Sequence, residues 1–169
     1  MGFTPSIHLH FATGFASDIA MQLERAEALT GRRQWYPSYY TEALLALNGF
    51  RVEEADLGPD CTSVIDFGRN IVFLSRPCRK DHRFWKLARA IATIRLKDKL
   101  GQLDAAAAIR VADLYARHLV LPAPRVQHYI AGQRADLIGS PLIRAVALEF
   151  TVPIYVVSAR MRELRERAA

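Results

Sequence analysis

The chain has 169 residues, 51% of them hydrophobic, which is enough for one domain with a real core. Its only two cysteines, Cys61 and Cys78, do not make a disulfide scaffold and are expected to be reduced thiols, and no run approaches the roughly twenty apolar residues that cross a bilayer. The formal charge of +6 is compatible with an acidic or phosphate-rich partner, and the lack of an apolar leader core predicts a cytoplasmic protein.

Two helices are predicted near the start of the chain. Apolar residues at three-and-four spacing mark residues 16–29, where Ser17 or Asp18 can cap the helix. The same spacing marks residues 37–47, and Asn48-Gly49 ends that helix.

Three strand-like runs follow, at residues 50–55, 62–67 and 71–74. Turn-forming residues separate them, and Gly68-Arg69-Asn70 joins the second and third runs as an antiparallel hairpin. These runs predict a small antiparallel β-sheet.

The segment after the hairpin, residues 81–96, carries a long helical pattern that no Gly or Pro interrupts. Its apolar residues fall broadly on one face, so it is predicted to be the central core helix. From Arg79 to Lys99 basic residues outnumber acidic ones. If these residues share a face they form a patch for phosphates, and otherwise they form an ordinary solvated helix face.

The second half of the chain predicts four more helices. Asp104 can cap a helix over residues 105–120, which Pro122 ends, and a short helix over residues 125–130 follows. Residues 141–149 and 153–167 then give a helix, a short turn and a helix.

The last of these helices carries Arg160, Arg162 and Arg165, as expected of a helix near DNA. Two apolar helices that pack back on the domain explain the same pattern equally well. Both interpretations remain open from the sequence.

One stretch resembles the ImmA/IrrE family of small zinc-peptidase-like proteins, in which a hairpin leads into a helix that carries an H-E-x-x-H motif. Here the helix opens with Arg83-Phe84 and keeps the family's spacing. The resemblance places Arg89 and Thr93 where the family has its two metal-binding histidines, and Ala90 where it has the glutamate that activates water.

A second stretch, residues 112–122, is similar to the A-N-x-F-A-x-x-L-L-M-P signature of the same family. In this frame the family's third metal ligand falls at Ile109. His118 lies opposite the core residues of the signature and is expected to be exposed. The resemblance therefore identifies four metal-site positions, Arg89, Ala90, Thr93 and Ile109, that carry none of the family's functional groups.

The resemblance implies an α+β fold. A mainly helical, zincin-like peptidase domain with a small antiparallel sheet would occupy residues 1–135, and a helix-turn-helix-like tail packed on it would occupy residues 136–169.

The side chains at the metal-site positions exclude the family's chemistry. Two histidines four residues apart can bind one zinc ion while the adjacent carboxylate takes a proton from water. Arginine cannot ligate zinc, threonine is a poor ligand and alanine transfers no proton. We therefore expect no peptidase activity, no metal and no cofactor. Arg89 is expected either to be enclosed and paired with an acceptor or to lie in water.

The leading hypothesis is a non-catalytic, ImmA/IrrE-like regulatory binding protein. Its partner, implied by the resemblance alone, is a helix-turn-helix repressor or a similar protein in a stress-response or mobile-element system. The residues expected to bind the partner or DNA are all basic: Arg83, Lys86, Arg89, Arg160, Arg162 and Arg165.

Two alternatives come from other functional classes. One is a DNA-binding transcription or replication factor that uses the basic helix and the arginine-rich tail. The other is an enzyme with a different site built around His82, Arg89, His118 or His128, although their spacing defines no reaction.

Overall fold

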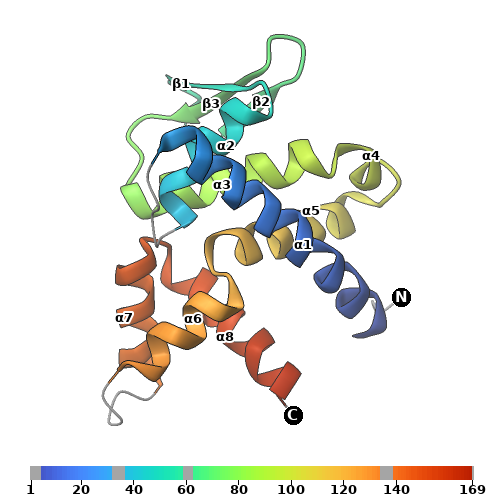
Figure 1. Cartoon of the computed structure of the whole chain (residues 1–169). Coiled ribbons are helices and arrows are strands. Elements are labelled where there is room, and N and C mark those ends of the chain that lie inside the picture. Colours follow the sequence, from blue (N-terminus) through green and yellow to red (C-terminus); the bar gives the residue numbers. More distant parts are fainter. Residues whose placement is uncertain (1–4, 32–36, 59–62, 134–138, 169) are drawn as a thin grey trace.

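The computed structural model describes residues 5–31, 37–58, 63–133 and 139–168 (Figure 1). In these ranges the chain forms eight α-helices, one short 3-10 helix and a three-stranded sheet. The predicted α+β class is therefore confirmed. Figure 1 shows the sheet at one end of the molecule and the last three helices at the other.

The N-terminal helix, α1 (Pro5–Thr30), begins well before the predicted start. Asp18 therefore lies in the middle of α1, and its predicted capping role is wrong. Its carboxylate instead accepts hydrogen bonds from Arg95 and from the hydroxyl of Tyr115, two residues of other helices. Burial and the hydrogen bond to Asp18 raise the pKa of Tyr115.

The second predicted helix consists of a 3-10 turn, η1 (Pro37–Tyr40), followed by α2 (Thr41–Leu47). Asn48 ends α2 as predicted, and its side chain donates a hydrogen bond to the Leu44 carbonyl at 2.7 Å. This bond satisfies one of the carbonyls that the helix end leaves unpaired.

The sheet contains β1 (Arg51–Ala55), β2 (Ser63–Asp66) and β3 (Ile71–Ser75) in the order β1-β3-β2. The predicted β2–β3 hairpin is antiparallel, but β1 pairs with β3 in parallel, so the sheet is mixed and the prediction of a wholly antiparallel sheet is wrong. The apolar strand β3 takes the centre, whereas the charged residues of β1 suit an edge that faces water.

The helical core is built on α3 (Lys80–Arg95), which packs along α5 (Ala105–Val120). The short α4 (Lys97–Leu100) lies in the chain segment that connects them. The predicted central helix is confirmed. Asp104 caps α5 as predicted, because its Oδ1 accepts a hydrogen bond from the Ala107 amide at 2.8 Å.

The chain ends with α6 (Ala123–Ala131), α7 (Ser140–Phe150) and α8 (Ile154–Ala168). The axes of α7 and α8 bend by 113° across a three-residue turn, which is the geometry of a helix-turn-helix. Thr151 in this turn has a left-handed backbone with φ of 53°. A hydrogen bond with the Thr151 side chain lowers the pKa of Tyr39 in η1, so the turn is tied to the N-terminal half.

None of the described helices is by itself both long and apolar enough to cross a membrane, and α7 and α8 pass that test only when taken together as a bent pair.

Candidate functional site

Arg89, at the first metal-site position, forms an ion pair with Asp113 across the α3–α5 interface. The Arg89 Nε lies 2.7 Å from the Asp113 Oδ1, and the two side chains are 42% and 30% exposed. Arg89 is therefore paired with a carboxylate but not enclosed. The sequence allowed either an enclosed, paired arginine or one that lies in water, and the structure combines pairing with exposure to water. Asp113 was not among the site residues predicted from the sequence. Its position four residues after Ile109 on the same helix could have indicated it, since residues four apart share a face.

The other metal-site positions do not converge on Arg89. Ala90 is buried in the core and Ile109 is exposed on α5. Thr93 donates its hydroxyl proton to the Arg89 carbonyl at 3.0 Å, so its side chain bonds to its own helix. Across the described ranges, no group of three His, Cys, Asp or Glu side chains is arranged to hold a metal ion.

Tyr155, in the first turn of α8, lies beside this face of α3. Its ring centroid is 6.5 Å from that of Trp85 in an edge-on contact and 6.4 Å from that of His82. Burial raises the pKa of Tyr155, and the nearby charges of Arg89 and Asp113 act on it in opposite directions. The helix-turn-helix segment thus borders the Arg89–Asp113 pair.

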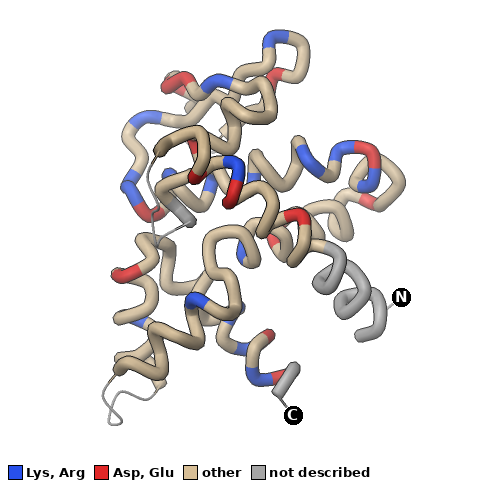
Figure 2. The backbone as a smooth tube through the Cα atoms, viewed as in Figure 1, with Lys and Arg blue, Asp and Glu red and all other residues tan. Residues whose placement is uncertain are grey.

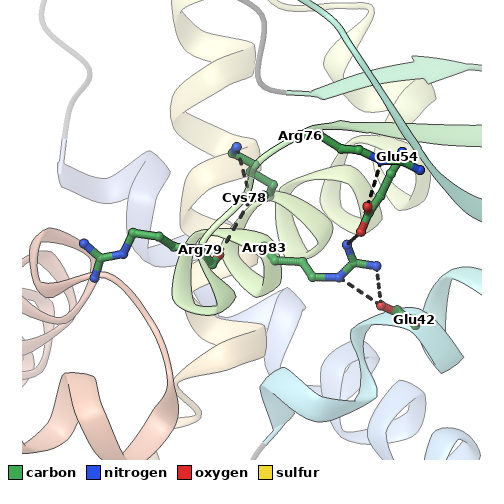
Figure 3. Close-up of polar contacts among 7 residues, drawn as sticks. Glu42, Glu54, Arg76, Cys78, Arg79 and Arg83 are labelled. Atoms are coloured by element: carbon green, nitrogen blue, oxygen red, sulfur yellow. Dashed lines mark hydrogen bonds and ion pairs between the residues drawn. The ribbon is translucent and has the colours of Figure 1, made fainter.

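The predicted partner-binding residue Arg83 is held by two carboxylates from other elements (Figure 3). It donates to Glu54 of β1 at 2.7 Å and to Glu42 of α2 at 2.9 Å, and Arg76 donates to the same Glu54 at 3.0 Å. Burial tends to lower the pKa of Arg83, but these two glutamates raise it above its ordinary value. Arg83 therefore connects α3 to α2 and the sheet.

Lys86 points to the loop before α3. Its Nζ donates to the Sγ of Cys78 at 3.3 Å, and the Cys78 thiol donates to the Arg79 carbonyl at 3.6 Å. Cys78 is a free thiol, and Cys61 lies outside the described residues.

Several of the basic residues around α3 are paired with carboxylates. Arg79 pairs with Asp81, and Arg95 pairs with Asp18. Figure 2 shows acidic segments interspersed with the basic ones and no continuous basic stripe in this view. These ion pairs favour the interpretation of α3 as an ordinary solvated helix face over its interpretation as a patch for phosphates.

Arg160 lies inside the protein, where α8 meets the end of α5. It is 2% exposed, and its Nε donates to the carbonyl of Leu121, the residue that ends α5, at 2.9 Å. Its Nη1 donates to His118 Nε2 at 2.7 Å and to Glu163 at 3.0 Å. The expectations that Arg160 faces DNA and that His118 is exposed are both wrong. The guanidinium supplies the donor that the helix end needs.

Glu163 completes this buried cluster. It also accepts a hydrogen bond from Arg117 at 2.7 Å. Burial alone would raise the pKa of Glu163, but neighbouring His118, Arg117 and Arg160 lower it from 4.5 to about 2. Arg162 and Arg165, the other two arginines predicted on α8, are exposed.

No protein-family model matches the chain, and no curated protein matches it. The fold is similar to a solved structure described as a Mycobacterium tuberculosis transcriptional regulator, with a TM-score of 0.64 and 20% sequence identity. The match covers 85% of this chain and 46% of the other, so this chain spans about half the length of that regulator. At this identity the likeness shows a shared fold.

Proposed function

We propose that this protein is a non-catalytic regulatory binding protein, a pseudo-peptidase of the ImmA/IrrE kind. It acts on a transcriptional repressor or a similar protein partner in a stress-response or mobile-element system. The observation that carries the proposal is the Arg89–Asp113 ion pair, because the resemblance assigns the position of Arg89 to a zinc-binding histidine, and a guanidinium with its own counter-ion stands there instead.

The chemistry at this site supports binding without cleavage. A guanidinium donates hydrogen bonds and cannot ligate a metal, and the buried methyl group of Ala90 cannot take a proton from water. Asp113 is already engaged by Arg89. The resemblance supplies the partner class, and the similarity to a protein described as a transcriptional regulator is consistent with it.

A direct experiment mixes the purified protein with a helix-turn-helix repressor encoded beside its gene. We expect a stable complex by calorimetry, an intact repressor on a denaturing gel and no stoichiometric zinc by elemental analysis. Cleavage of the repressor that stops when a chelator is added would contradict the proposal.

A DNA-binding role is the second candidate, because the α7–α8 corner has helix-turn-helix geometry and exposes Arg162 and Arg165. If these arginines contact phosphates, changing both to alanine should reduce the slope of log affinity against log salt by roughly two. Fluorescence anisotropy with a labelled duplex at several salt concentrations measures that slope. Duplex affinity that does not respond to salt would exclude this role.

A further inference from the structure

A groove of about 880 Å³ lies between the start of α3 and the α7–α8 corner. One wall comes from the start of α3 and the residue before it. The rest comes from the end of α7, the turn and the first half of α8. The lining residues used below are Arg79, Asp81, Arg144, Leu148, Ile154, Tyr155 and Arg162.

The groove presents large apolar side chains to solvent. Leu148 is 84% exposed, Ile154 53% and Tyr155 57%, and all three belong to the α7–α8 corner. Single exposed apolar residues are ordinary, but several that share one groove mark a surface that another molecule covers. The described residues of the chain leave these three side chains uncovered.

The lining of the groove carries a net positive charge. It contains three arginines, Arg79, Arg144 and Arg162, and one carboxylate, Asp81. Asp81 is 3.1 Å from Arg79 in an ion pair. In Figure 3, Arg79 points away from the Arg83–glutamate network and toward α7 and α8. A ligand for this groove therefore needs apolar groups to cover the exposed apolar side chains and negative charge to pair with the arginines.

We propose that this groove binds an acidic amphipathic helix of a protein partner, with the apolar face of that helix on Leu148, Ile154 and Tyr155. Its carboxylates pair with the arginines that line the groove, of which Arg144 and Arg162 come from different helices of the corner. The inference rests on the proposed function and names the chemistry of the partner. The exposed apolar side chains favour a protein over DNA, since a helix that reads DNA presents polar and basic side chains to base edges and phosphates.

The test selects helical peptides from a displayed library on the wild-type protein. Apolar residues are fixed at i, i+4 and i+7, and the flanking positions vary between Glu and Lys. We expect the selected peptides to carry Glu on the flanks. Selection of Lys, or of both equally, would overturn the charge argument.

The strongest selected peptide is then labelled, and its affinity is measured by fluorescence anisotropy. Leu148→Glu should weaken binding by at least about tenfold, and the Arg144→Glu, Arg162→Glu double variant should do the same. The matched controls, Met21→Glu and Arg25→Glu, change an exposed apolar residue and an exposed arginine of α1, outside the groove, and should leave affinity within about twofold. All these positions are exposed, and thermal melts check that each variant folds.

Equal affinity of wild type and the groove variants for the selected peptide would overturn the inference. So would displacement of DNA from the wild-type protein by that peptide, because the groove would then be a DNA site. The proposed function is judged separately with the intact repressor. If the repressor binds the Leu148→Glu variant as tightly as wild type, the groove is not its binding site, but the proposed function stands. If the groove binds the peptide and the protein cleaves the repressor, the proposed function is wrong.

Discussion

The ion pair between Arg89 and Asp113 contributes little to stability, because both side chains are substantially exposed to water. We expect Arg89→Ala to lower the free energy of unfolding by about 1 kcal/mol or less, since solvent screens a pair of this exposure. A double-mutant cycle with Asp113→Ala, measured by urea denaturation, isolates the pair. A loss of 3 kcal/mol or more, the value for an enclosed arginine, would mean that the pair organises this site.

Glu163 makes the stability of the protein depend on acid pH. Its pKa is about 2 in the folded protein and 4.5 ordinarily, so the stability it contributes is present above pH 4.5 and is lost as the pH falls toward 2. The difference corresponds to about 3 kcal/mol. We expect Glu163→Gln to show a smaller loss of stability than wild type between pH 5 and pH 2.5 in urea titrations.

Glu166→Gln is the matched control for that experiment, because Glu166 is an exposed residue of the same helix. Its acid response should equal that of wild type. Equal responses of wild type and Glu163→Gln would show that Glu163 is not held by its basic neighbours.

Helix α8 is held against the end of α5 by one buried arginine, Arg160. Arg160→Met keeps most of the side-chain volume but removes the donors to Leu121, His118 and Glu163. Glu163 then loses one of its cations, so we expect a loss of about 3 kcal/mol. Arg162→Met, at an exposed position of the same helix, should change stability by less than about 0.5 kcal/mol. Thermal melts compare the two, and equal effects would contradict the role of Arg160.

Helical periodicity predicted the described helices α3 and α5 closely, because each buries one apolar face. It did not predict the parallel pairing of β1 with β3, since strand direction depends on tertiary contacts and not on local pattern. The burial of Arg160 had a signal that went unused: it lies three and four residues after Val157 and Val156, on the apolar stripe of α8. Asp113 also had a signal in the sequence, since it lies four residues after Ile109 on the same helix, but its pairing with Arg89 depends on how α3 faces α5.

The C-terminal helices are part of the hydrophobic core. Arg160 bonds to the end of α5, and Phe150 of α7 packs edge-on against Tyr129 of α6 with ring centroids 6.0 Å apart. Deletion of residues 136–169 would uncover these surfaces, so we expect residues 1–135 alone to show no cooperative thermal transition. A sharp two-state melt of that fragment would show that the predicted division is a boundary between independent domains.

The strand order β1-β3-β2 also has a consequence for how the chain folds. The β2–β3 hairpin closes through a short turn that contains Asn70 with φ of 56°, whereas β1 pairs with β3 across the whole β2 segment, with Arg51 opposite Ile71. Local pairing loses less chain entropy than distant pairing, so the hairpin is expected to form early and β1 to join late. Changes in the hairpin turn should then slow refolding, whereas changes in β1 should mainly speed unfolding.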